Sequence, residues 1–195
     1  MRLTETVDVP DVALPVQAMK DHLRLGSGFA DDGMQDALIR GYVRAAMAAV
    51  EGRIGKALIA REFLLTLMRW RDAEAQPLPV APVVAVASVT VVDDAGVPVA
   101  VPSSRWRLEA DLHRPKLVAR GALLPAVPVG GRAEVVFQAG FGAWDAVPAD
   151  LRQAVMLLGA QYHELRHEGS VAAMPFGVMA LIERWRTVRV LGGGA

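Results

Sequence analysis

The sequence predicts an α+β fold: a small helical bundle of two long and two short helices, with a β-rich insertion between the helix pairs. Three observations lead to this prediction. Two long segments, one near each end of the chain, repeat apolar residues with the period of a helix. The segments between them are short and often alternating, and proline and glycine turns separate them. Strands and helices do not alternate along the chain, which argues against a parallel α/β sheet.

The composition is typical of a folded globular protein and excludes several kinds of site. Apolar residues make up 53% of the 195 residues, which suits one domain or one domain with a small subdomain. The absence of cysteine excludes disulfides, thiolate nucleophiles and cysteine-ligated metal centres. The 21 basic and 21 acidic residues cancel, which argues against a protein that binds polyanions by bulk charge. No apolar run is long enough to cross a bilayer, and residues 1–10 do not resemble a signal peptide, so we expect a cytoplasmic origin.

The first helices are predicted between residues 15 and 55. Residues 1–14 should form an extended arm, and Pro15 can open a short helix that ends near Gly26. A long helix should follow the N-capping residues Asp31 and Asp32. Two neighbouring rows of apolar residues form its wide apolar stripe. The first row is Leu38, Tyr42, Ala45 and Ala49, and the second is Ile39, Val43, Ala46 and Val50.

Six short strands are predicted in the middle of the chain. They cover residues 62–70, 83–92, 97–101, 106–108, 116–118 and 134–137. The second and third strands should form a β-hairpin, because the Asp93-Asp94-Ala95-Gly96 segment between them is a typical turn.

The C-terminal part returns to helical periodicity. Pro148 begins the second long helix, and a short helix is expected around residues 178–186. The apolar row of the long helix is Leu151, Val155, Leu158, Tyr162 and Leu165. We therefore expect residues 1–60 to form an N-terminal helical part, residues 61–142 the β-rich insertion, and residues 143–195 a C-terminal helical part that packs with 1–60 as one core.

One segment of the second long helix matches the H-E-x-x-H pattern of zinc hydrolases. Two histidines four residues apart, His163 and His167, lie on one face of a helix and can bind a zinc ion. Glu164 would then act as general base on a bound water molecule, and Glu183 is a candidate third ligand.

Three features of the same helix argue against a zinc site. Arg166 would place a fixed cation beside the metal, and Glu168 adds a charge where such helices normally enter the core. His163 and His167 lie about 100–200° from the centre of the apolar row that begins at Leu151, given about 100° per residue. We expect an exposed polar helix end here, with no metal or other cofactor. A small zinc hydrolase is kept as the alternative function.

The most basic and aromatic segment follows this helix. Arg184, Trp185, Arg186 and Arg189 occur together, with no acidic residue after Glu183. Cations are favourable at the C-terminus of a helix, which is one interpretation. Tryptophan and arginine are also typical anchors of protein interfaces, which favours a docking segment. Direct contact with nucleic acid is the third interpretation.

Segments spread over most of the chain share their order and spacing with a known family. They are residues 16–24, 38–46, 50–51 and 54–58, the proline-led strand 82–89, the Ala139-Gly140-Phe141-Gly142 motif, Val147-Pro148, Leu151, Ala154 and residues 163–166. In this order they resemble the head–tail connector (adaptor) proteins of tailed bacteriophages, including those of phage-derived gene transfer agents. The family often has an aromatic residue in place of His163, followed by Glu and Arg at the positions of Glu164 and Arg166. The zinc-like pattern would then be incidental.

The resemblance implies a structural protein and not an enzyme. Such proteins form a ring, commonly of twelve subunits, below the portal at the capsid vertex. The ring extends the DNA channel and holds the next tail or stopper component. A net charge of zero suits a channel wall along which DNA slides without specific binding. The protein would act at the head–tail joint of the particle, without any membrane.

The resemblance also implies where the portal binds. C-terminal segments of the family contribute to portal attachment, which corresponds to residues 176–190 of this chain. The candidate portal contacts are Phe176, Arg184, Trp185, Arg186 and Arg189. A generic protein-binding module with a β insertion is a further alternative.

Overall fold

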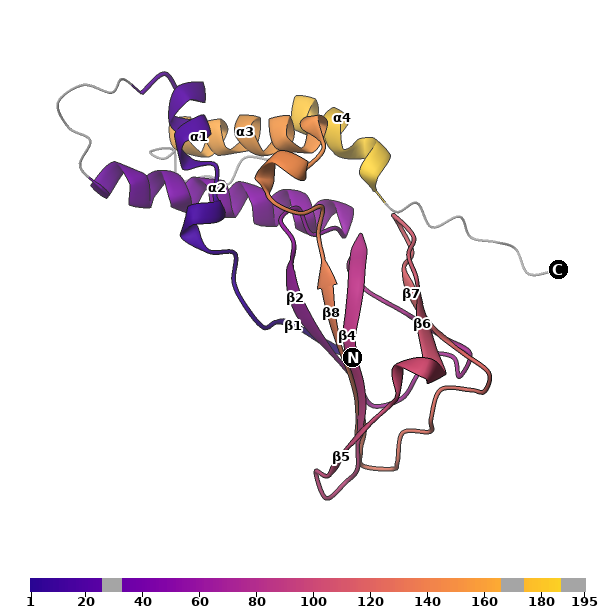
Figure 1. Ribbon diagram of the computed structural model, residues 1–195. Helices are drawn as coiled ribbons and strands as arrows, with labels where there is room; N and C mark the ends of the chain where they lie inside the picture. Colours follow the sequence, from indigo (N-terminus) through magenta and orange to yellow (C-terminus); the bar gives the residue numbers. More distant parts are fainter. Residues whose placement is uncertain (26–32, 166–173, 187–195) are drawn as a thin grey trace. The chain divides into compact units, whose positions relative to one another are not determined.

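The computed structural model confirms the α+β fold, and it describes residues 1–25, 33–165 and 174–186. Four helices and two antiparallel sheets form two compact units in this part of the chain (Figure 1). The β unit comprises Met1–Pro10 and Lys56–Ala146, and the helical unit comprises Asp11–Gly55 and Val147–Ala195. None of the described helices is long and apolar enough to cross a membrane.

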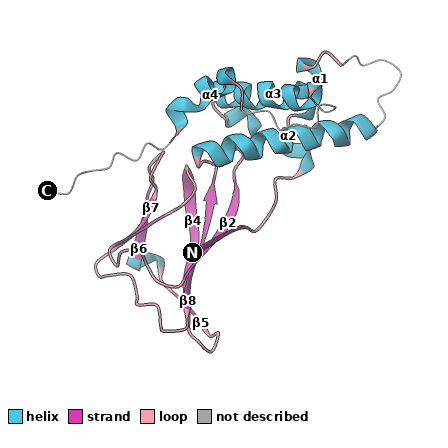
Figure 2. Ribbon diagram, turned by 180° about the vertical axis from the view of Figure 1, so that it is seen from behind, coloured by secondary structure: helices cyan, strands magenta, loops and turns pink. Residues whose placement is uncertain are grey.

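The helical unit is built on two long helices, α2 (Gly33–Ile54) and α3 (Ala149–Glu164), which pack on each other. The short helix α1 (Val16–His22) contacts both, and α4 (Phe176–Ile182) packs on α3. Short 3₁₀ turns occur at η1 (Asp11–Ala13) and η4 (Glu183–Trp185). Figure 2 shows the helices and strands coloured by type.

Only one of the two predicted apolar rows of α2 is buried. Ile39, Val43, Ala46 and Val50 lie in the core, together with Leu151, Val155 and Leu158 of α3. The other row, Leu38, Tyr42, Ala45 and Ala49, is exposed or half-buried, so the buried stripe is narrower than the two predicted rows together. Adjacent rows differ by about 100° around a helix, so the second row lies at the side of the contact with α3, where the Tyr42 ring still reaches His163.

The β unit contains a five-stranded sheet in the order β1-β2-β8-β4-β5 and a three-stranded sheet in the order β3-β7-β6. The strands of the large sheet are β1 (Arg2–Glu5), β2 (Arg61–Leu67), β8 (Arg132–Ala139), β4 (Val83–Val92) and β5 (Pro98–Ala100). Those of the small sheet are β3 (Ala75–Pro77), β7 (Lys116–Ala119) and β6 (Trp106–Glu109), and the 3₁₀ turns are η2 (Ser103–Arg105) and η3 (Trp144–Ala146).

Alternate residues of the strands fill the core of the β unit. Phe63 and Phe137 are opposite each other on β2 and β8, and their rings stack at 5.7 Å. Leu117 of the small sheet joins the same apolar cluster. The predicted hairpin is confirmed as β4 and β5. Strands β1 and β3 were not predicted, because residues 2–5 are mostly exposed and β3 has only three residues.

The two ends of the β insertion are held side by side. The amide of Ala60 donates to the carbonyl of Gly142 at 2.8 Å, and the amide of Phe141 donates to the carbonyl of Leu58 at 3.0 Å. Gly140 has φ +132°, and a Cβ atom there would collide with the backbone of Ala60. Only glycine fits both the conformation and the space.

Replacing Gly140 by alanine should therefore destabilise the protein. We expect Gly140→Ala to lower the free energy of unfolding by about 3 kcal/mol or more, because the added Cβ atom forces the backbone at residue 140 away from Ala60. Gly41→Ala is the matched control: this position of α2 is open to solvent, and alanine should raise stability by about 0.5–1 kcal/mol. Urea denaturation measures both. Equal effects of the two substitutions would contradict this account.

Candidate functional site

The predicted docking segment forms α4 and the 3₁₀ turn η4 that follows it. Pro175 precedes α4, and its fixed φ suits the entry into a helix. Val178 and Ile182 face the core, one turn apart. On the other side of the short helix, Phe176 is 87% exposed and Ala180 is also exposed. An exposed phenylalanine beside small residues is a typical surface for a protein partner.

Asp150 fastens this segment to the first turn of α3. Its Oδ2 atom accepts hydrogen bonds from Trp185 Nε1 and from Arg184 Nε, each at 2.7 Å. The guanidinium of Arg184 also lies over the indole ring of Trp185, 4.9 Å from its centroid. The indole is only 9% exposed. One carboxylate thus fixes the place of both the aromatic ring and the cation.

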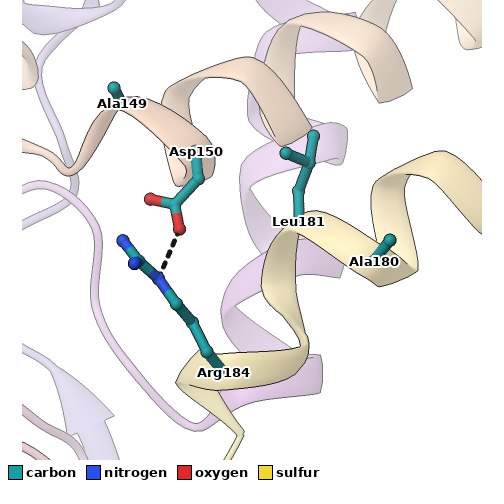
Figure 3. A pocket seen from close by; sticks show the side chains of 5 residues that line it. All are labelled: Ala149, Asp150, Ala180, Leu181 and Arg184. Atoms are coloured by element: carbon teal, nitrogen blue, oxygen red, sulfur yellow. Dashed lines mark ion pairs between the residues drawn. The ribbon is translucent and has the colours of Figure 1, made fainter.

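A shallow hollow of about 390 Å³ lies beside this contact. Its lining consists of Ala149, Asp150, Ala180, Leu181 and Arg184 (Figure 3). Small apolar side chains form much of the lining, and Asp150 is already paired with Arg184 (Figure 3). The hollow contains neither a nucleophile next to a base nor a pair of carboxylates. It suits a side chain of a protein partner better than a reacting substrate.

The structure separates the predicted portal contacts. Phe176 and Arg184 are exposed, whereas Trp185 is buried in the helical unit and supports α4 from inside. Arg186 forms an ion pair with Glu183 at 2.9 Å. Arg189 lies outside the described residues. The sequence pattern could not distinguish a buried indole from an exposed one, because its partner Asp150 precedes it by 35 residues.

The zinc-like segment lies at the end of α3. His163 is half-buried, and its ring meets that of Tyr42 edge to face at 5.9 Å. Glu164 is exposed, and Glu183 is bonded to Arg186. His167, Arg166 and Glu168 lie outside the described residues. Within the part of the chain that the structure describes, no three His, Asp or Glu side chains are placed to hold a metal ion.

Sequence reasoning missed a buried lysine in the β unit. Lys56 is 1% exposed, and its Nζ donates to the carbonyl of Leu112 and lies 3.3 Å from His113 Nδ1. Burial lowers the pKa of Lys56, and the nearby Asp111 carboxylate partly opposes this shift. The backbone amides of His113 and Arg114 donate to Asp111 and lower the pKa of its carboxyl group. The turn between β6 and β7 is therefore anchored on Lys56.

No family model and no curated protein sequence matches the chain, but solved structures match it over almost its full length. A chain in the neck of the empty gene transfer agent (GTA) particle, computed with C6 symmetry, is 59% identical with a TM-score of 0.90. A chain in the neck of the native GTA particle, computed with C12 symmetry, is 55% identical with a TM-score of 0.86. A chain in the virion of the native GTA particle is 59% identical with a TM-score of 0.87. Each comparison covers 99% of both chains.

The bond between Asp150 and Trp185 predicts a loss of stability in Asp150→Ala. Removing the carboxylate leaves a buried indole N–H without its acceptor, so the free energy of unfolding should fall by about 1.5–3 kcal/mol. Hydrogen exchange in residues 176–185 should become faster. Asp94→Ala, at the exposed tip of the β4–β5 hairpin, is the control and should stay within about 0.5 kcal/mol of the original protein. Unchanged exchange in α4 would show that Asp150 does not hold it.

The buried Lys56 predicts a pH dependence of stability. Its pKa in the folded state lies below the ordinary value of 10.5, so between these two values the unfolded chain binds more protons than the folded one. Stability from this group should therefore rise as the pH increases through that window. Lys56→Met keeps the apolar stem and should remove this rise. Urea titrations of both proteins at pH values up to 10.5 measure it, and parallel curves would count against the assignment.

Proposed function

Since the chain belongs to the family of neck proteins of gene transfer agent particles, we propose that it is the adaptor, which forms a ring below the portal, extends the DNA channel and docks the tail. The observation that carries the proposal is the 59% identity over 99% of both chains with a neck subunit. The expected resemblance to this group of particle proteins is confirmed at the level of the neck. The adaptor role within the neck is our inference from the residues quoted above.

A ring explains the symmetry of the related necks. The relatives occur in necks computed with sixfold and twelvefold symmetry. In a cyclic ring each subunit meets its two neighbours through two different faces. We propose a ring of twelve copies for this chain, which agrees with the C12 symmetry with which a related neck was computed. A wall built of such copies has no need of a reacting site, and the shallow hollow at α4 agrees with a structural role.

The α4 surface is the proposed contact with the portal. Phe176 and Arg184 would meet the portal directly, since both are exposed. Arg186, which is paired with Glu183, and Arg189, which lies outside the described residues, remain proposed contacts from the sequence alone. Trp185 would act indirectly, because its indole is bonded to Asp150 and fixes the position of Arg184. The hollow beside Leu181 would receive an apolar side chain of the portal.

Removing the Phe176 ring should weaken portal binding without unfolding the protein. We expect Phe176→Ala to lower the affinity for the portal of the same particle by about tenfold or more, the effect of losing an interface anchor. Val12→Ala is the matched control, since Val12 is also exposed in the helical unit. Co-purification and binding titrations with the isolated portal measure the difference, and thermal unfolding checks that both variants keep their fold.

Electron microscopy of particles tests the role itself. Necks made with the original protein should show it as a ring between portal and tail, and particles lacking the protein should have filled heads without tails. A neck in which this chain occupies a different layer, away from the portal, would contradict the adaptor assignment. Portal binding that is equally strong for Phe176→Ala would move the contact away from α4.

A further inference from the structure

The β unit is neutral as a whole, but its charges are separated. Residues 69–77 and 102–123, which include the small sheet, carry seven basic and four acidic side chains. The rest of the β unit carries four basic and seven acidic side chains. The two halves therefore have opposite net charge. Such a distribution favours contact between unlike ends of identical molecules.

Three arginines form a basic surface at one end of the small sheet, which we call the arginine rim: Arg71, Arg105 and Arg120. All three are exposed. The amide of Arg120 donates to the carbonyl of Arg105, and the amide of Ala119 donates to the carbonyl of Glu74, so the three segments run side by side. In the described part of the chain none of the three side chains forms an ion pair with a carboxylate. Leu123, whose side chain is 55% exposed, lies beside this rim, because its carbonyl accepts a hydrogen bond from the Arg105 guanidinium at 3.3 Å.

The opposite flank of the β unit presents an open strand edge, which we call the β1 edge: residues 2–8 with Glu62, which carry three acidic side chains and one basic one, Arg2. Among the strands that the structure describes, β1 pairs with β2 alone, so the other side of its backbone has no partner strand there. Val7 is 63% exposed, and Asp8 and Glu62 are exposed as well. Strand β1 is the edge of the large sheet beyond β2, and Figure 1 places the small sheet on the other side of β8 and β4. An open edge of this kind readily accepts another chain.

We propose that neighbouring copies in the ring contact each other through their β units, with the β1 edge of one copy against the arginine rim of the next. The inference rests on the proposed ring and names the partner of this surface as a second copy of the same chain. The two faces differ, lie on opposite flanks and have complementary charge, as a closed cyclic assembly requires. Val7 and Leu123 supply apolar area to the same contact. DNA would be repelled by Asp8 and Glu62, so a second copy fits the β1 edge better than a nucleic acid does.

Charge reversal tests the complementarity. Arg71→Glu with Arg105→Glu and Arg120→Glu should reduce ring assembly at least tenfold, and so should Asp8→Lys with Glu62→Lys. A chain carrying all five changes should assemble again, because the opposite signs are restored with their positions exchanged. Arg53→Glu, an exposed position of α2, is the control and should assemble normally. Native mass spectrometry and electron microscopy of necks give the fraction of closed rings. Failure of the five-fold variant to recover would overturn the charge-based contact, provided its fold is intact by circular dichroism.

Cross-linking tests the contact without changing its charge. The chain has no cysteine, so Val7→Cys with Leu123→Cys introduces the only two thiols. A short flexible bis-maleimide should join copies of this variant in assembled necks into a ladder of multimers. Val7→Cys with Val129→Cys is the matched control, since Val129 is also exposed in the β unit, and should give no ladder.

The outcomes separate the contact from the ring. Closed rings that give no Val7–Leu123 cross-link, and that tolerate either set of charge changes, would overturn the proposed contact while the adaptor role stands. Cross-linking of these positions to another neck protein or to DNA would overturn it as well. Absence of this chain from necks altogether would instead overturn the proposed function.

Discussion

The fold depends on the point where the chain enters and leaves the β insertion. Ala60 and Leu58 are bonded there to Gly142 and Phe141, and Gly140 lets the two backbones touch because it has no Cβ atom. The long-range pairing of β2 with β8 starts from this contact and continues along seven residue pairs. A closed insertion returns the chain to the helical unit, where α3 can pack on α2. A few backbone hydrogen bonds therefore hold together the two ends of a segment of about eighty residues, and they offset the entropy lost when this loop closes.

A second contact, between Asp150 and the segment after α4, holds the C-terminal part of the described helical unit in place. Asp150 lies in the first turn of α3 and binds both Trp185 and Arg184, so the segment that carries the exposed side chains of α4 is held in place. Interface residues are most effective when their positions are set before the partner arrives, since less conformational freedom is lost on binding. The buried indole therefore matters for a surface that it does not itself form. A similar arrangement occurs in the β unit, where Lys56 anchors the turn between β6 and β7.

The sequence predicted the elements that are long and periodic, and the turns with strong local signals. Both long helices, the β4–β5 hairpin and the α+β fold were found in this way. Strand β1 escaped because its pattern has no buried side, and only pairing with β2 defines it. Leu38 and Ile39 are both apolar, so the sequence could not tell that Ile39 is buried and Leu38 exposed; packing in the folded protein decides this. At the candidate site, the residue types indicated a docking segment, but the burial of Trp185 depends on a contact that spacing along the chain does not encode.

The meeting of residues 58–60 with 140–142 also has an evolutionary consequence. The segment between these positions begins and ends at the same place in the fold. Its length and sequence can therefore change while the hydrogen bonds that join its two ends are kept. Such a module can be shortened or enlarged away from β2, whose pairing with β1 ties the module to the N-terminal segment.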